Sequence, residues 1–232
     1  MTEKGILLVD KPLNWTSFNV VSYIRSIIAK SKGVRSSSIK VGHIGTLDPL
    51  ATGLMVILIG KEFTTRAQSL SKLDKIYEVQ AKLGYVTKSF DREFEEEFFS
   101  NKVPLSDSVL RALKSFIGES LQAPPIFSAI KINGQRAYQL ARSDQDVEIK
   151  DRPVNIYYID KIVYQYPYLR FETKVSSGTY IRSLVNDLGL MLKCGAYLSS
   201  LNRIAVGPFK LSDAIKIESL TYPKIEKNLK KN

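Results

Sequence analysis

A single carboxylate lies in the most basic part of this sequence. Asp48 is the only acidic residue between Lys11 and Lys61, a span that also holds seven Lys and Arg residues. Nearby cations stabilise an ionised carboxylate. A carboxylate that attacks a carbon atom must be ionised, whereas a general acid must be protonated and is favoured by burial away from cations. The charge pattern therefore favours Asp48 as a nucleophile.

The stretch around Asp48 reads V-G-H-I-G-T-L-D-P-L-A-T-G (residues 41–53) and also contains His43, the only histidine. An Asp-Pro pair commonly begins a helix or a turn, with Asp as the N-cap and Pro at the first position. A purely structural role for Asp48 therefore stays open, and in that case His43 is an ordinary turn residue.

Arg182 is the second unusual residue. The sequence predicts a helix capped by Thr179, in which Arg182 occupies the third position. The helix dipole disfavours a cation there by about 0.3–1 kcal/mol, and a nearby anion would offset this cost. The candidate anions are Asp48, Asp187 and a phosphate group.

Rare and missing residues exclude several reaction classes. With one histidine and one cysteine, Cys194, the chain cannot build a His/Cys zinc site or an intrachain disulfide. It contains no G-x-S-x-G, G-x-x-x-x-G-K-[ST] or G-x-G-x-x-G motif. The remaining catalytic candidates are carboxylates, tyrosines, lysines and arginines, and the expected compartment is the reducing cytoplasm.

The composition favours a nucleic-acid partner. The chain has 232 residues, 44% of them hydrophobic, which is enough for one large domain or two small ones. Its 34 basic and 23 acidic residues give a net charge of +11, which is typical of proteins that bind polyanions. We expect no membrane association, because the N-terminus lacks a signal-peptide pattern and the apolar runs, such as Leu54–Ile59, are short.

The hydrophobic pattern predicts both strands and helices. Strands are predicted at residues 5–9, 54–59, 77–83, 169–175 and 198–206. Three helices are predicted, and their candidate caps are Thr16 or Ser17, Ser106 or Asp107, and Thr179. Gly118 is expected to end the second helix. Because the elements follow no strict βαβ order, we expect an α+β fold with a mixed, mostly antiparallel β-sheet flanked by helices and loops.

Three segments stand apart from this core. Residues 123–153 open with P-P, contain an N-G turn and carry five basic residues, which predicts an inserted basic hairpin-and-helix arm. Residues 90–99 are acidic and are expected to be solvated. Residues 224–232 are expected to form a basic tail. The expected organisation is thus a single catalytic domain, residues 1–232, carrying the arm as an insertion.

Several ordered blocks of the chain resemble the bacterial TruB family of tRNA pseudouridine synthases. They are G-I-L-L-V-D-K-P from residue 5, G-H-I-G-T-L-D-P-L-A-T-G from residue 42, K-I-Y-E-V from residue 75, P-P-I-F-S-A-I-K from residue 124, S-S-G-T-Y-I-R-S-L from residue 176 and L-N-R-I-A-V-G from residue 201. The resemblance implies a pseudouridine-synthase-like fold. It also implies an isomerase that converts uridine 55 in the T-loop of tRNA to pseudouridine, with no metal or other cofactor.

The resemblance also implies roles for individual residues. Asp48 would be the catalytic nucleophile, and Arg182 the cation paired with it. Tyr77 would pack on the target base and is a candidate proton acceptor, although a lone Tyr at the start of a strand is ordinarily core packing. The route of the reaction stays open among attack on the sugar C1′, attack on the base, and a glycal intermediate.

Further residues are implied to bind the substrate. His43 would occupy the space left by the flipped nucleotide, while Tyr180 and Leu201 would line the uracil pocket; by pattern alone, the last two cannot be distinguished from core. Lys11-Pro12 belongs to a structural motif beside the site. The arm at residues 123–153 would be the thumb that closes over the T-arm stem-loop of tRNA. A monomer without an obligate protein partner is expected.

The sequence departs from the family pattern at two places. The usual T-D-T-x-D-x-x-G block reads T-K-S-F-D-R-E-F, in which Lys88 replaces the first acid, Asp91 keeps the second and the glycine is missing. Only 25 residues follow Gly207, too few for the C-terminal PUA-type RNA-binding domain of many relatives. We expect the lysine-rich tail to contact phosphates instead, which makes binding dependent on salt.

Three other functions stay open on the sequence alone. The chain could be a non-enzymatic chaperone that flips and refolds the T-arm of tRNA. It could be a relative of the guide-RNA-dependent pseudouridine synthases, which act inside a multi-protein particle. The third alternative is a hydrolase that uses His43.

Overall fold

The computed structural model describes residues 4–128, 131–132, 135–136 and 149–231. The chain forms two compact units, the first made of residues 1–77 and 201–232 and the second of residues 78–200. It passes between them inside two strands, β4 (Lys75–Leu83) and β12 (Ala196–Val206), each of which contributes to both units. We describe each unit by itself.

The sheet of the first unit is built around β3 (Ala51–Ile59), whose residues are almost all buried. β1 (Gly5–Lys11) pairs with β3 in antiparallel orientation along its full length, and β2 (Val41–Ile44) pairs antiparallel with its second half. β12 runs parallel to the first residues of β3, with Leu201 opposite Ala51. β13 (Phe209–Lys210) pairs antiparallel with the end of β12, and β14 (Ile215–Lys216) pairs parallel with β1. Continuous apolar runs suit strands that are covered on both faces.

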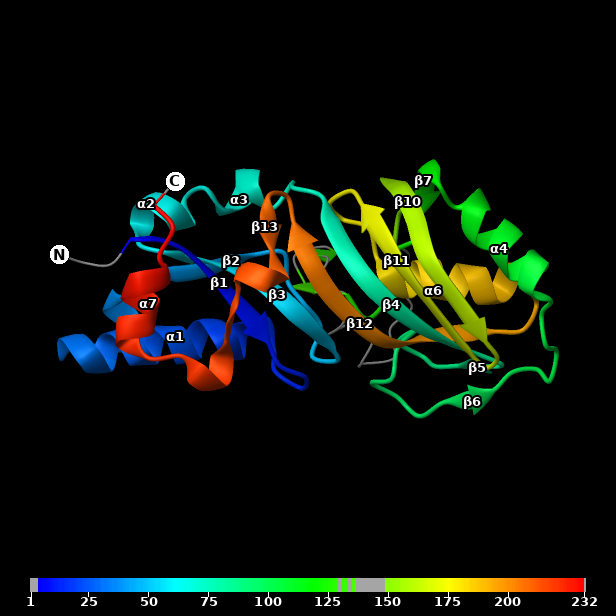
Figure 1. Ribbon diagram of the computed structural model, residues 1–232, viewed down its shortest axis with the longest axis horizontal. Coiled ribbons are helices and arrows are strands. Elements are labelled where there is room, and N and C mark those ends of the chain that lie inside the picture. Colours follow the sequence, from blue (N-terminus) through cyan, green and yellow to red (C-terminus); the bar gives the residue numbers. More distant parts are fainter. Residues whose placement is uncertain (1–3, 129–130, 133–134, 137–148, 232) are drawn as a thin grey trace. The chain divides into compact units, whose positions relative to one another are not determined.

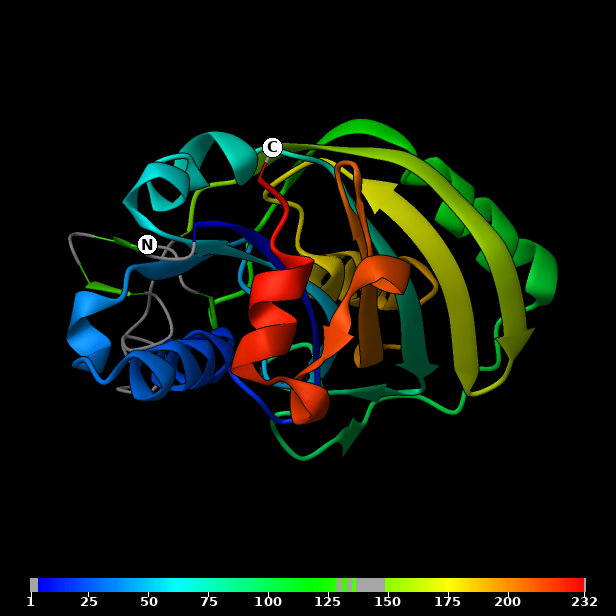
Figure 2. The same cartoon turned by 60° about the vertical axis from the view of Figure 1, so that its left-hand side comes forward.

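Helix α1 (Ser17–Lys32) packs its apolar stripe against this sheet. Thr16 caps it in a reciprocal capping box with Asn19, and Gly33 ends it in the left-handed conformation, with φ 64°. The unit also contains the short α-helices α2 (Lys61–Thr64), α3 (Ala67–Leu70) and α7 (Tyr222–Asn228). In Figures 1 and 2, α7 lies beside α1 and β1.

The second unit contains the strand order β12-β4-β11-β10-β7. β10 (Arg152–Gln165) pairs antiparallel with both β11 (Tyr168–Val175) and β7 (Gly118–Gln122). The unit also contains two short antiparallel strand pairs, which are β5 (Tyr85–Val86) with β6 (Glu97–Phe98) and β8 (Lys131–Ile132) with β9 (Gln135–Arg136). Helix α6 (Ile181–Met191) lies on one face of the main strands, beside α4 (Ser106–Ser115) (Figure 1).

The predicted α+β class and mostly antiparallel sheet are confirmed. Several predicted boundaries are wrong. The residue at the N-cap of α6 is Tyr180 rather than Thr179, and that of α4 is Leu105, neither with a side-chain cap. Gly118 begins β7 instead of ending the preceding helix, because its φ of 114° suits the sharp change of direction between the two elements.

The predicted arm and tail are also more structured at their edges than expected. The predicted hairpin around residues 133–134 is present as the β8–β9 pair, while residues 129–130, 133–134 and 137–148 lie outside the described part. Arg152 and Pro153 belong to β10. Within the predicted tail, α7 buries Ile225, and Lys230 exchanges backbone hydrogen bonds with Ile6. The expectation of one catalytic domain with a thumb stays a prediction.

Substitution of Gly53 should reveal how closely the strands of the first unit pack. Gly53 has φ 97°, and a Cβ there would lie 2.5 Å from the backbone oxygen of Arg203 on β12. We expect Gly53→Ala to lower the free energy of unfolding in urea by about 3 kcal/mol or more.

The matched control is Gly33→Ala, at a φ of 64° with open space around the position. Its cost should be limited to backbone strain, about 1–2 kcal/mol. Equal losses for the two variants would contradict the packing argument.

Candidate active site

Asp48 lies in a tight turn between β2 and β3. The backbone N–H of Ala51 donates to the carbonyl of Asp48 at 3.0 Å, and β3 begins directly at Ala51. No helix follows, so the Asp-Pro pair begins a turn, as one of the two structural interpretations predicted, and not a helix. Pro49 occupies the second position of the turn, where its fixed φ is favourable. The Asp48 side chain is half-buried.

Two neighbouring segments hold this turn in place. Ser17, buried in the first turn of α1, accepts a hydrogen bond from Leu47 N at 2.9 Å and donates one to Leu47 O at 3.0 Å. The backbone N–H of Asn14 donates to Pro49 O at 2.8 Å. The residues on either side of Asp48 are therefore fixed by hydrogen bonds to the start of α1 and the loop before it.

Lys11 provides a buried cation beside the turn. Its side chain is 0% exposed, and Nζ donates to Pro12 O at 2.9 Å, Trp15 O at 2.6 Å and Pro49 O at 3.4 Å. Burial lowers the pKa of Lys11 to about 8, while the negative charge of Asp48 acts to raise it. The amine is therefore mostly protonated at pH 7, and its charge favours an ionised carboxylate at Asp48.

Arg203 is a second fully buried cation, and sequence reasoning missed it. Its Nε donates to Leu54 O at 2.8 Å and its Nη2 to Gly45 O at 2.9 Å, so it joins β12 to β3 and to the loop that leads to Asp48. Burial lowers the pKa of Arg203, and a hydrogen bond with Tyr77 opposes that shift. The signal available in the sequence was an arginine inside the predicted core strand L-N-R-I-A-V.

The first unit holds four of the six predicted site residues. Tyr77 on β4 is buried and bonded to Arg203, and Leu201 on β12 lies opposite Ala51 at the end of the Asp48 turn. His43 on β2 lies 3.2 Å from Thr46 through Nε2 and Oγ1. Burial and the charge of Arg203 lower the pKa of His43, so the ring is neutral at pH 7.

The second unit holds Arg182, in the first turn of α6, in a buried ion pair. Its Nε lies 3.5 Å from Oδ2 of Asp91, and the two side chains are 5% and 1% exposed. The guanidinium also donates to the carbonyls of Ser89 at 3.1 Å and Phe127 at 2.8 Å. The Asp91 carboxylate and these two carbonyls compensate the unfavourable placement of a cation in the first turn of a helix. Its pairing with Asp48 stays a prediction.

Asp91 is itself held by hydrogen bonds from its own segment. Ser89 Oγ donates to Oδ1 at 2.6 Å, the backbone N–H of Glu93 donates to the same oxygen at 2.9 Å, and Thr87 Oγ1 donates to the Asp91 carbonyl at 2.6 Å. Lys88, the position at which the sequence departs from the family block, is exposed. The hydrogen bonds that hold Asp91 are present without an acid at that position. The retained acid therefore positions Arg182.

Tyr180 lies immediately before α6 and is fixed through its backbone. The amide of Gln122 accepts from Tyr180 N at 2.8 Å and donates to Tyr180 O at 3.1 Å. The Tyr180 side chain is partly buried.

The described residues offer neither a cluster of metal ligands nor a helix suited to span a membrane. Among these residues, no three His, Cys, Asp or Glu side chains are grouped as metal ligands. No helix in the described part of the chain is both long and apolar enough to cross a membrane.

Comparison with solved structures gives the class of protein. The chain resembles a structure titled "Crystal Structure of a Cbf5-Nop10-Gar1 Complex" with a TM-score of 0.69 and 30% identity, over 93% of this chain and 53% of that one. A substrate-RNA-bound H/ACA RNP structure gives a TM-score of 0.66 at 28% identity. The chain spans about half the length of these structures. Its fold is that of a pseudouridine synthase.

Family models and curated relatives make the assignment narrower. The model described as the N-terminal domain of TruB family pseudouridylate synthase matches residues 31–181, and that of the tRNA pseudouridylate synthase B C-terminal domain matches residues 182–231. tRNA pseudouridine synthase B of Chlorobaculum tepidum is 43% identical over 95% of this chain and 91% of that protein. The enzyme of Phocaeicola vulgatus is 44% identical over 94% and 92%.

The chain belongs to the TruB family of pseudouridylate synthases. It is an RNA-binding isomerase that forms pseudouridine in tRNA, as the resemblance implied. The alternatives of a non-enzymatic chaperone and of a hydrolase are thereby set aside.

Ser17 tests whether the braced turn matters for catalysis. Ser17→Ala leaves the N–H and C=O of Leu47 without their partner, so we expect a loss of about 1–3 kcal/mol in unfolding free energy. Displacement of Asp48 should also lower kcat for pseudouridine formation by about tenfold. The control, Ser69→Ala, removes only an exposed helical hydrogen bond and should change neither quantity. An unchanged kcat in Ser17→Ala would contradict the bracing role.

Asp91 tests the buried ion pair. Asp91→Asn leaves the Arg182 guanidinium buried beside a neutral amide, so we expect the unfolding free energy to fall by about 3–5 kcal/mol. Asp213→Asn is the comparison, because Asp213 pairs with Lys230 at the exposed surface and its loss should leave stability unchanged. Urea denaturation of both variants measures the difference, and similar midpoints would count against the assignment.

Proposed function

We propose that the tRNA target is uridine 55 in the T-loop and that Asp48 is the nucleophile. The observation that carries this proposal is the braced turn itself: a half-buried carboxylate whose neighbours are fixed by Ser17 and Asn14. Buried cations at Lys11 and Arg203 lie beside the same loop. This arrangement suits a reacting carboxylate, which must be both ionised and immobile.

The target nucleotide first leaves the RNA stack. Flipping costs a few kcal/mol, and stacking on an aromatic ring returns about 1–3 kcal/mol. Tyr77 is proposed to provide that ring, and its bond to Arg203 would hold it in place. The neutral His43 is proposed to fill the vacated space, with Tyr180 and Leu201 lining the uracil pocket.

The chemistry is an isomerisation in which all atoms are conserved. In the proposed route through the sugar, the Asp48 carboxylate bonds to C1′ while the bond from C1′ to N1 breaks, leaving the electron pair on the uracil. The trapped uracil turns and C5 bonds to C1′, which releases Asp48. The C5 proton then leaves and N1 gains a proton. Attack on the base and a glycal route conserve the same atoms. Arg182 is proposed to stabilise the carboxylate, and no metal or redox cofactor is required.

The proposed substrate complex is a monomer bound to the T-arm of cytoplasmic tRNA, without an obligate protein partner. The net charge of +11 supports binding to phosphates, so affinity should fall steeply with salt. The arm at residues 123–153 is proposed to act as a thumb over the stem-loop, and the lysines near the C-terminus to contact phosphates.

Asp48→Asn tests the nucleophile. We expect tritium release from C5-labelled uridine in tRNA to fall at least about a thousandfold, because the bond-breaking group is lost. Binding of an unmodified T-arm hairpin should be retained, since the amide has nearly the same shape. The control variant Asp213→Asn changes an exposed acid and should remain active. Substantial turnover by Asp48→Asn would overturn the assignment.

The same assay addresses the target and the partners. A pseudouridine map of tRNA treated with the purified chain should show one new site, at position 55. A requirement for guide RNA or for added proteins would instead favour the guide-dependent alternative.

A further inference from the structure

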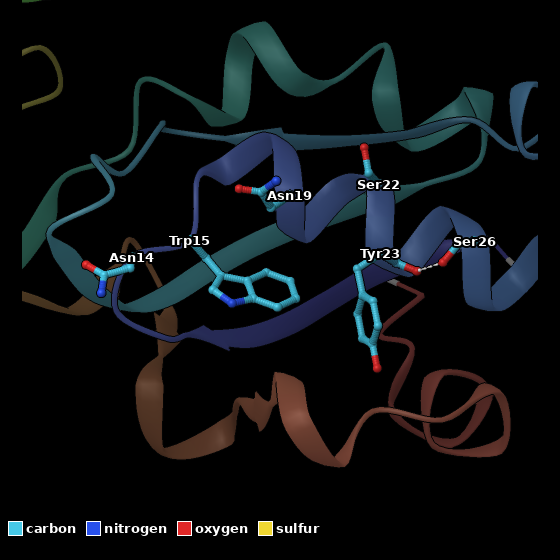
Figure 3. Close-up of a pocket in the computed structure, with 6 residues that line it drawn as sticks. All are labelled: Asn14, Trp15, Asn19, Ser22, Tyr23 and Ser26. Carbon is cyan, nitrogen blue, oxygen red and sulfur yellow. Dashed lines mark hydrogen bonds between the residues drawn. The ribbon is translucent and has the colours of Figure 1, made fainter.

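We infer that a hollow on helix α1 binds an unpaired nucleobase of the tRNA substrate, separately from the target uridine. The hollow has a volume of about 530 Å³ and lies wholly in the first unit (Figure 3). Its lining residues are Asn14, Trp15, Asn19, Ser22, Tyr23 and Ser26. The inference rests on tRNA as substrate, and it depends neither on Asp48 nor on position 55.

An aromatic pair forms one wall of the hollow. The rings of Trp15 and Tyr23 meet edge to face, with centroids 5.6 Å apart and an interplanar angle of 90°. Tyr23 is 37% exposed, and Trp15 is only partly buried. Solvent-accessible aromatic rings provide platforms on which any nucleobase can stack, because every base has a π-face.

Polar groups lie near this pair: in Figure 3, Asn19 lies beside Trp15 and Ser26 beside Tyr23, whereas the Ser22 hydroxyl points away from both rings. In the capping box, Oδ1 of Asn19 accepts from Thr16 N at 2.8 Å and from Thr16 Oγ1 at 2.6 Å, so the amide is oriented and its Nδ2 serves as a donor. Ser26 Oγ donates to Tyr23 O at 2.7 Å, which leaves the hydroxyl oxygen as an acceptor. Fixed donors and acceptors beside a stacking platform suit the edges of an unpaired base.

The charge of the segment suits RNA as the occupant. Residues 12–47, which include the entire lining, contain five Lys and Arg residues and no Asp or Glu. Such a segment attracts the phosphates that accompany a nucleobase. Stacking rings and neutral polar groups suit the base of a nucleotide, and the positive charge of the segment suits its phosphate.

The hollow also shares a support with the Asp48 turn. Asn14 N donates to Pro49 O at 2.8 Å, and Lys11 Nζ donates to Trp15 O at 2.6 Å. The loop that carries two lining residues is thus the loop that holds the turn. A nucleotide bound at Trp15 therefore gives the RNA a fixed contact on the unit that contains Asp48.

Trp15 is the only tryptophan in the chain, so its fluorescence reports on this hollow alone. The full chain would be titrated with unmodified tRNA and, separately, with a fully paired RNA duplex. We expect quenching by tRNA and none by the duplex, because only unpaired bases can stack on the indole. Absence of quenching at saturating tRNA, or equal quenching by the duplex, would overturn the inference.

Variants provide a second test. Trp15→Ala should raise KM for tRNA about tenfold while kcat changes less than about twofold, and Trp15→Phe should restore most of the affinity. Phe18→Ala is the control, because Phe18 is 69% exposed on the same helix and outside the hollow. Equal KM values for Trp15→Ala and Phe18→Ala would overturn the inference. Where Trp15→Ala fails to fold, the fluorescence of the unmodified protein decides. A missing pseudouridine at position 55 would reject the proposed target without affecting the quenching.

Discussion

The structure of the first unit depends on the hydrogen bonds that buried cations make with the carbonyls around the Asp48 turn. Lys11 and Arg203 are fully buried, and each compensates the loss of water by donating to main-chain oxygens. Burial without such partners would cost several kcal/mol per charge. The same donors fix the loops on either side of Asp48, so compensating these charges also positions the carboxylate.

The second unit also buries a cation, Arg182, but compensates its charge with a carboxylate, that of Asp91. Arg182 lies in the first turn of a helix, where the dipole opposes a cation, and Asp91 offsets that cost from a segment far away in the sequence. Hydroxyls of the T-x-S stretch then hold Asp91. A guanidinium restrained in this way by an acid and two carbonyls has little freedom to change its rotamer. Such restraint suits the role proposed for Arg182, which is to stabilise the Asp48 carboxylate in a fixed place.

The loop at residues 12–16 has several roles because it lies between Lys11 and the start of α1. It receives hydrogen bonds from Lys11, donates one to Pro49, and supplies the cap of α1 at Thr16. A loop tied at so many points is rigid, and rigid elements are where binding groups are held most accurately. The aromatic hollow on α1 uses that rigidity at the surface, whereas the Asp48 turn uses it inside.

Much of this protein could be predicted from the sequence, because strand alternation, helical spacing and turn residues are local signals. They predicted the α+β class, an α1 cap at Thr16 or Ser17, and the candidate Asp48 in its basic segment. The partners of the buried charges could not be predicted: Arg203 reaches Leu54 across 149 residues, and Arg182 meets Asp91 from another element. Periodicity reports which face of an element is buried, but not what lies opposite. Only the pairing of β12 with β3 and the packing of α6 decide that, because contacts between distant segments form through tertiary structure.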